Sequence, residues 1–320
     1  MGVLLRLTLA AFALFACTAH AQSYPNRPVR LIVPFVPGGS ADFFARALAP
    51  ELSEALGQPV VIDNRGGAAG VIGTELAARA APDGYTLLLG TANTAMNVSL
   101  YKTWSVDPVK DLKAVALLGS APNMLAVNPA FPAKNVKELI ALAQAKPGQI
   151  NYASGGSGST SHLATELFKA LAHVNLVHVP YKGTGPAVVA TVSGEAMIVI
   201  PPASVVLPQD KAGRLRAIAT CSLSRLESAP QIPTVAESGV PGYEAAQWYG
   251  IIVPAATPDA LVRRLNRELV KVVQTPDFRT RMLKEATTVS GTSAEEFAAY
   301  LKSEIAKWAK VVRISGAHVE

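Results

Sequence analysis

The hydrophobic and polar positions of residues 29–46, VRLIVPFVPGGSADFFAR, form three successive patterns. Val29–Val33 is an unbroken apolar run, which is typical of a strand buried on both faces of a parallel sheet. The strand should end at Pro34, because proline cannot donate a ladder hydrogen bond. Apolar residues then recur at helical spacing: Phe44, Ala47 and Leu48. The stretch therefore predicts a strand, a Pro/Gly loop and a helix, with Ser40 or Asp42 as the helix N-cap.

The same order of patterns returns at residues 150–170, INYASGGSGSTSHLATELFKA. In both stretches the first N–H groups of the helix lack internal partners, and with the helix dipole they favour a carboxylate or a phosphate. Gly38 and Gly39 carry no Cβ to keep a ligand from the backbone. The second loop adds serine and threonine hydroxyls. Either loop alone would fit an ordinary βα connection, but the pair predicts an anion-binding cleft between two lobes.

Strand-like and helix-like segments alternate along the rest of the chain. Strands are predicted at 58–63, 85–89, 177–179 and 215–220, and helices at 65–76, 135–145, from Ala187, from Thr257–Pro258, from Thr275–Pro276 and from Ser293. This alternation predicts an α/β fold with mostly parallel sheets, whose ligands bind beyond the C-terminal ends of the strands. Thr91 would lie at such an end.

The predicted lobes are connected twice. At roughly 150 residues per domain, a chain of 320 residues predicts two domains. Two strand-like segments within 115–128 follow each other without a long helix between them, and residues 247–254 resemble a return strand. We therefore predict a discontinuous lobe 1 of residues 22–123 with 248–320, and a lobe 2 of residues 124–247.

The N-terminus has the pattern of a secretory signal. Arg6 precedes an apolar run that is too short to span a bilayer, and Ala19-His20-Ala21 forms an A-x-A cleavage site. We predict a signal peptide over residues 1–21, with lipid attachment at Cys17 as a minor alternative. After cleavage at Ala21 a single cysteine remains, Cys221, which cannot form an internal disulfide and fits a small core residue.

Composition narrows the possible partners. Half of the residues are hydrophobic and 16% are charged, as in a well-packed globular protein. The net charge of +6 is spread without a basic run, and aromatic residues make up only 6%, so nucleic acid is not a predicted partner. A modest positive field instead favours small anionic solutes.

A serine hydrolase is the enzymatic alternative. Residues 155–159 nearly match the G-x-S-x-G nucleophile motif around Ser157, but Ser159 stands where the last glycine is needed. His173 and His178 lie five apart with no cysteine nearby, which is not metal-ligand spacing. We predict no catalytic residue, no metal and no cofactor.

Taken together, the motifs resemble the periplasmic solute-binding proteins of tripartite tricarboxylate transporters, also called Bug receptors. The resemblance runs through the whole mature chain and rests on these segments: YPNRPVRLIVPFVPGGSADFFAR from Tyr24, NRGGAAGVIG from Asn64, PDGYTLLLG from Pro82, YASGGSGSTSHLATELF from Tyr152, VPYKGTGPA from Val179, GRLRAIA from Gly213 and IPTVAESGVPGYEAAQWYGIIVPAATP from Ile232.

The resemblance implies a type II periplasmic binding fold, in which two α/β lobes joined by two crossing segments close like a Venus flytrap on a ligand. It implies small organic anions or amides as ligands, and integral-membrane transporter subunits as partners of a monomeric periplasmic receptor. A receptor that reports to a membrane sensor instead of a transporter remains an alternative.

The resemblance also assigns ligand-binding positions. They are Phe35, Gly38, Gly39, Ser40 and Asp42 in the first loop, and Ser154, Gly158, Ser159 and Thr160 in the second. Asp42 is expected to position waters or cap the helix. Tyr181 is expected to form a wall of the cleft. His162 is expected either to donate to the ligand or to support the structure.

One departure from the family pattern concerns ligand charge. Where the family commonly reads Gly-Gln-Val-Asp, this chain reads Gly194-Glu195-Ala196-Met197. A thioether at Met197 in place of a carboxylate would disfavour cationic or amino-acid ligands and favour a plain or partly apolar carboxylate.

Overall fold

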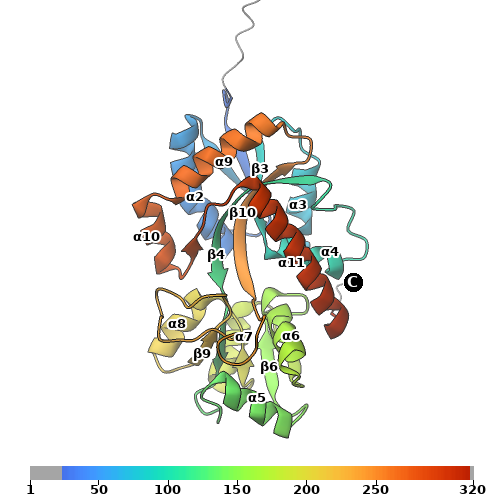
Figure 1. Ribbon diagram of the computed structural model, residues 1–320, viewed down its shortest axis with the longest axis vertical. Coiled ribbons are helices and arrows are strands. Elements are labelled where there is room, and N and C mark those ends of the chain that lie inside the picture. Colours follow the sequence, from blue (N-terminus) through green and yellow to red (C-terminus); the bar gives the residue numbers. More distant parts are fainter. Residues whose placement is uncertain (1–23, 318–320) are drawn as a thin grey trace, which may run out of the picture.

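The computed structural model describes residues 24–317 of the 320-residue chain. The predicted signal peptide and Cys17 lie outside the described residues. The described chain forms two α/β lobes, one above the other in Figure 1, each built around its own sheet. Lobe 1 here denotes the part with the six-stranded sheet, and lobe 2 the part with the five-stranded sheet.

The sheet of lobe 1 has the strand order β11-β4-β10-β3-β1-β2. Its strand β1 pairs in parallel with β2 and β3, whereas β10 runs antiparallel to β3 and β4. The predicted buried strand at Val29–Val33 is confirmed to the residue. The strands are β1 (Val29–Val33), β2 (Val60–Asn64), β3 (Thr86–Thr91), β4 (Leu112–Pro122), β10 (Ala246–Pro254) and β11 (Thr288–Val289).

The sheet of lobe 2 has the order β7-β6-β8-β5-β9. Strand β6 pairs in parallel with β7 and β8, while β5 runs antiparallel to β8 and β9. The strands are β5 (Met124–Val127), β6 (Asn151–Ser154), β7 (Val177–Pro180), β8 (Ile198–Val199) and β9 (Arg216–Thr220).

Helices cover both sheets. Those of lobe 1 are α2 (Ser40–Leu56), α3 (Val71–Ala78) after the short 3-10 turn η1 (Ala68–Gly70), α4 (Ala92–Leu100), α9 (Asp259–Val273), α10 (Pro276–Lys284) and α11 (Ala294–Ser315). Those of lobe 2 are α5 (Val136–Ala145), α6 (Thr160–Ala172), α7 (Thr184–Ser193) and α8 (Ala203–Lys211). Helix α11 contacts α4 in lobe 1 and α6 in lobe 2, and Figure 1 shows it descending beside β10.

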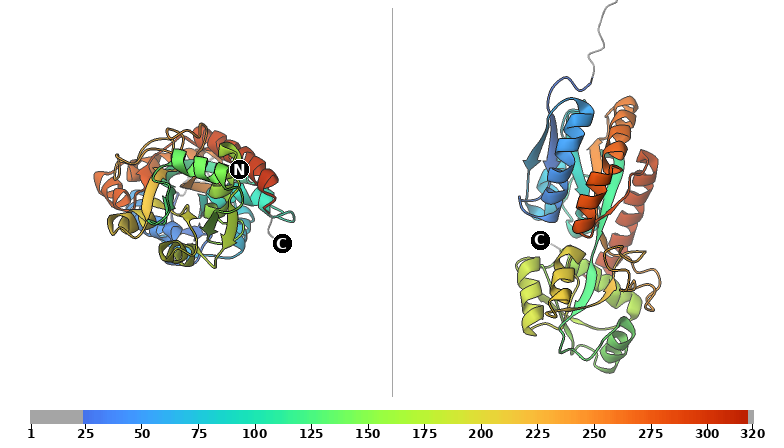
Figure 2. Two further views of the ribbon diagram at one scale, coloured as in Figure 1. Left: turned by 90° about the horizontal axis from the view of Figure 1, so that it is seen from below. Right: turned by 90° about the vertical axis from the view of Figure 1, so that its left-hand side faces the viewer.

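Two crossing segments join the lobes, and they are tied to each other. Asn123 lies between β4 and β5, where the chain changes sheet, and its Nδ2 donates to the carbonyl of Ala245, 3.1 Å away, just before β10. The N–H of Cys221 donates to the Asn123 carbonyl at 2.8 Å, and the N–H of Ala245 donates to the Cys221 carbonyl at 2.9 Å. Figure 2 shows the long strands passing between the lobes. The exact lobe boundaries stay a prediction.

Several sequence-based elements need correction. The sheets are mixed and not mostly parallel, and helix α8 was not predicted. Residues after Thr91 form α4, which was not predicted, because Ala92, Ala95, Met96 and Leu100 are buried and the hydroxyl of Thr94 accepts from the N–H of Thr91 at 3.2 Å. Helix α7 begins at Thr184 instead of Ala187, because Gly183 serves as its N-cap.

Cys221 is a small core residue, as predicted. Its side chain is fully buried, and the hydroxyl of Tyr243 donates to its Sγ at 3.5 Å. Burial raises the pKa of the Cys221 thiol to about 12, so the thiol stays protonated at neutral pH.

A buried carboxylate fastens α11 to the central sheet of lobe 1. Glu304 is 2% exposed and accepts from the indole Nε1 of Trp248 at 3.1 Å and of Trp308 at 3.0 Å. Lys307 forms an ion pair with the same carboxylate. All the polar groups of this contact are therefore satisfied within the protein.

We expect Glu304→Ala to lower the free energy of unfolding by about 3–5 kcal/mol, because it leaves two buried indole N–H groups without an acceptor. Glu304→Gln keeps an acceptor oxygen and should cost clearly less. Urea denaturation followed by tryptophan fluorescence measures both. Equal stability of the wild type and Glu304→Ala would contradict this account.

Candidate functional site

The first loop connects β1 to α2 and lies open. Its helix begins at Ser40 with Gly39 as the N-cap, so the expectation of a Ser40 or Asp42 cap is wrong. Gly39 has no side chain to occupy the first N–H groups of α2. A Cβ built on Gly38 or Gly39 would meet nothing within 4 Å. The backbone at the positive end of α2 is therefore accessible to an anion.

The buried side chain of Asp42 stabilises the conformation of this loop through hydrogen bonds. Asp42 is 3% exposed, and its carboxylate accepts from the N–H of Gly38 at 2.9 Å and from Nδ2 of Asn64 at 3.0 Å. The Arg46 guanidinium donates to it at 2.8 Å, and this hydrogen bond, opposed by burial, holds the pKa of Asp42 below its usual value. The carboxylate of Asp42 is thus engaged within the protein, and its predicted place in the ligand site stays a prediction. Phe35 is partly buried against the core of lobe 1, and its carbonyl accepts from Asn64 at 3.1 Å.

Most polar groups of the second loop form hydrogen bonds within the protein. Ser159 is the N-cap of α6 and accepts from the N–H of His162 at 3.2 Å. Ser154 Oγ accepts from the N–H of Gly156 at 3.1 Å and lies 2.6 Å from Nε2 of His178. The hydroxyls of Ser154 and Ser159 thus fix the loop, contrary to the expectation that they face a ligand.

Two hydroxyls of the second loop stay available. Ser157 is exposed and Thr160 is half-buried, and neither hydroxyl has a hydrogen-bond partner within residues 24–317. The N–H of Gly158 is not available, because it donates to Nδ1 of His162 at 3.1 Å. Of the predicted ligand contacts in this loop, Thr160 alone keeps a free hydroxyl. Ser157 was noted as one of the loop hydroxyls and as a possible nucleophile, but it was not among the predicted ligand contacts.

Two further helix N-termini were not considered as anion-binding groups in the sequence analysis. Helix α7 begins at Thr184, whose N would lie 3.2 Å from a Cβ on Gly155, so its uncapped start lies beside the second loop. Helix α8 follows Pro202, without a side-chain cap, and brings Ser204 toward lobe 1. A Gly or Pro break before an apolar run was the available signal for both.

The lobes meet around a small cavity of about 30 Å³, which is the space of about one water molecule. Ser40, Phe43, Tyr249 and Glu285 line it from lobe 1, and Pro202 and Ser204 line it from lobe 2. The start of α2 therefore faces the start of α8 across the gap. Burial raises the pKa of Tyr249 to about 12, so its phenol remains a hydrogen-bond donor at neutral pH.

Three predicted contacts lie outside the two loops, although the N–H of Tyr181 donates to the Ser154 carbonyl at 2.9 Å, so that Tyr181 adjoins the second loop. Thr91 is fully buried, opposite Tyr249 in the sheet. The hydroxyl of Tyr181 is buried and its ring packs partly against the core of lobe 2, so only the exposed part of the ring stays a predicted wall. Met197 lies away from the two loops, so the geometry does not support its predicted role. Its N–H donates to Asn151, at the end of β6 opposite Ser154, and its effect on ligand charge stays a prediction.

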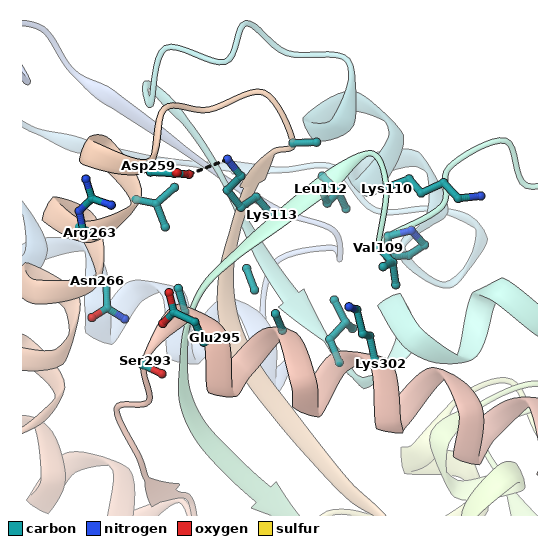
Figure 3. A pocket seen from close by; sticks show the side chains of 17 residues that line it. Val109, Lys110, Leu112, Lys113, Asp259, Arg263, Asn266, Ser293, Glu295 and Lys302 are labelled. Atoms are coloured by element: carbon teal, nitrogen blue, oxygen red, sulfur yellow. Dashed lines mark hydrogen bonds and ion pairs between the residues drawn. The ribbon is translucent and has the colours of Figure 1, made fainter.

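A larger cavity lies elsewhere, in lobe 1. It measures about 570 Å³ and is enclosed by the start of β4, α9 and α11 (Figure 3). Lys113 and Asp259 form an ion pair of 3.1 Å at its edge. None of the ligand-binding residues predicted from the sequence lines this cavity.

The geometry gives little support to the hydrolase alternative. Ser157 has no histidine partner among residues 24–317. The close Ser154–His178 pair has a fully buried serine, which no substrate carbonyl could approach. Within the same residues, no group of three or more His, Cys, Asp and Glu side chains is placed to hold a metal ion.

Two α/β lobes with two crossings and helix N-termini at their junction define a type II periplasmic binding protein. Residues 44–316 match the model of the tripartite tricarboxylate transporter family receptor, and the chain belongs to this family. Protein BugT of Bordetella pertussis is 37% identical over 320 residues, which cover 98% of each chain. The predicted family and fold are thus confirmed.

Solved structures agree. One described as a periplasmic transporter has a TM-score of 0.80 and 37% identity, and covers 93% of this chain and all of the other. The structure of R. palustris Rpa4515 with adipate has a TM-score of 0.80 and 35% identity, and the match covers 92% of this chain and 99% of that one. MatC (Rpa3494) from Rhodopseudomonas palustris with bound malate has a TM-score of 0.76 and 32% identity, and the match covers 90% of this chain and 100% of that one.

Among residues 24–317, no helix combines the length and apolar character needed to cross a bilayer.

The role of Asp42 can be tested with three variants. Asp42→Ala should lower the free energy of unfolding by about 1–3 kcal/mol, because it removes the acceptor of two partly buried donors. Asp42→Asn retains an acceptor oxygen and should cost less. Arg46→Ala removes only the exposed partner and should cost under about 1 kcal/mol. Urea denaturation measures all three, and a larger loss in Arg46→Ala than in Asp42→Ala would disprove this order.

The buried His162 makes stability depend on pH. Burial, and then the neighbouring His178, lower the pKa of His162 from 6.5 to about 4. Between these values the unfolded chain binds a proton that the folded chain does not, so stability should fall as the pH drops from 6.5 to 4. His162→Asn should show a shallower decline in thermal denaturation. Parallel curves for the two proteins across this window would contradict the assignment.

Proposed function

We propose that this receptor captures a small organic carboxylate between its lobes. The observation that carries the proposal is the open start of α2, where no side chain caps the first N–H groups and where an added Cβ meets no atom. One carboxylate would lie there, against Gly39 and Ser40. The groups that would reach it from lobe 2 are the free hydroxyls of Ser157 and Thr160 and the uncapped start of α7.

The available interactions are sufficient for tight binding. Micromolar affinity corresponds to about 8 kcal/mol. Partly buried helix ends contribute up to ~2 kcal/mol each, and hydrogen bonds to a charged ligand about 1.5–3 kcal/mol each. These contributions reach the required range without an arginine clamp, even after the cost of ordering the ligand and the lobes. Adipate and malate, bound by two relatives, are suitable first ligands.

The wider role follows from the family. In this proposal the signal peptide is cleaved after Ala21, and the periplasmic receptor works as a monomer that delivers its ligand to integral-membrane transporter subunits. It needs no metal or cofactor and carries out no catalysis. Ester hydrolysis that is abolished in Ser157→Ala would contradict the last point. Neighbouring genes for two multispanning transporter subunits would favour transport over sensing.

Gly39 offers a direct test of the anion site. An aspartate at this N-cap would satisfy the helix N–H groups itself and place a negative charge where the ligand carboxylate would lie. We expect Gly39→Asp to fold at least as stably as the wild type but to bind adipate or malate about 100-fold more weakly. Gly39→Asn, with the same shape and no charge, should lose less affinity. Calorimetric titration and thermal denaturation measure both properties.

Native mass spectrometry of the mature protein as purified would identify any retained ligand. A bound organic acid, one per chain, would support the proposal. It would be overturned by an empty protein that also gains no thermal stability from adipate, malate or citrate at concentrations where mass action predicts a shift. Unchanged affinity in Gly39→Asp would refute the assigned location of the anion.

A further inference from the structure

The two loops are held by the same kind of hydrogen bond. In each, a glycine with a positive φ precedes the N-cap and donates its N–H to the side chain four residues later. Gly38, with φ of +89°, donates to Asp42 at 2.9 Å, and Gly158, with φ of +76°, donates to His162 at 3.1 Å. In the first loop the acceptor is a carboxylate, and in the second it is an imidazole.

The imidazole of His162 is held in one protonation state by its surroundings. Because Nδ1 accepts from Gly158, the ring proton must lie on Nε2. Nε2 is 3.9 Å from Oε1 of Glu166, which accepts from the Tyr152 hydroxyl at 2.6 Å and from Lys169 at 2.7 Å. The side chain is 8% exposed. Both ring nitrogens therefore face the protein, and neither is directed to a ligand.

Stacking fixes the plane of the ring. The imidazoles of His162 and His178 lie 4.0 Å apart with an interplanar angle of 8°, and Tyr152 is nearly parallel to both. His178 in turn contacts Ser154 Oγ, which accepts from the N–H of Gly156. The second loop is thus anchored at Gly156 and at Gly158, on either side of Ser157.

We propose that His162 is a positioning residue for ligand binding, whose neutral Nδ1 lone pair fixes Gly158 and so directs Ser157 and Thr160 toward the carboxylate. This inference rests on the proposed function, because it assumes that the second loop receives the anion. It assigns His162 no contact with the ligand. Protonation of Nδ1 would oppose the Gly158 N–H and release the loop, while Glu166, Lys169, His178 and Tyr152 surround the remainder of the ring.

Substituting His162 by asparagine or by glutamine distinguishes the roles of its two ring nitrogens. In His162→Asn the introduced amide oxygen can occupy the place of Nδ1 and accept from Gly158, whereas the longer glutamine of His162→Gln carries its amide near the place of Nε2. Both variants are neutral and polar, so they form a matched pair. The amide hydrogen exchange of Gly158, followed by NMR in the ligand-free protein, reports the hydrogen bond itself. Calorimetric titration with adipate and malate reports its effect on binding.

We expect slow exchange at Gly158 and affinity within about threefold of wild type in His162→Asn. In His162→Gln we expect at least tenfold faster exchange at Gly158 and about tenfold weaker binding, as for the loss of one hydrogen bond. Equal affinities in the two variants, or fast exchange in wild type, would overturn the inference. If wild type binds neither acid while Gly158 behaves as expected, the proposed function fails but the hydrogen bond stands. Thermal denaturation checks that both variants fold.

Discussion

The antiparallel pairing of β4 with β10 is the constraint on which the rest of the molecule depends. These two strands continue past the sheet of lobe 1 to the point where Asn123 and Ala245 are joined, so their ladder fixes where lobe 2 begins. Register shifts after Tyr249 and Ile251 interrupt the ladder, as bulges do. The buried Glu304 then attaches α11 to Trp248 of β10, and α11 reaches α6 in lobe 2.

At the junction of the lobes, the groups that remain to bind a ligand are mainly backbone N–H groups and only a few side chains. Most serine hydroxyls of the second loop are used to shape the loop, and Asp42 shapes the first. What remains for a ligand is unsatisfied N–H groups at helix starts and a few free hydroxyls. Such donors carry no net charge of their own, so in the proposed function the preference for an anion would come from the helix dipoles. A site of this kind accommodates different carboxylates by shape.

The sequence was most informative where local patterns decide the structure. The buried run Val29–Val33 and the capping box at Ser293 appear as predicted, since both depend on neighbouring residues. It was least informative about side-chain direction. Ser154 and Thr160 both carry a hydroxyl at an edge of the same loop, yet one is buried against His178 and the other is free. The sequence placed Met197 near the ligand, but its position relative to the loops is set by the pairing of β8 with β6, which are distant in the sequence.

The buried thiol of Cys221 has a practical consequence for measuring movement between the lobes. It is the one free cysteine among residues 24–317, and its high pKa and full burial make it a poor nucleophile toward maleimide reagents. Ile72 on α3 and Val189 on α7 are exposed and belong to different lobes. Cysteines introduced at these two positions can therefore carry a fluorophore pair with the native thiol left in place, so that any change in the distance between the lobes is reported by energy transfer.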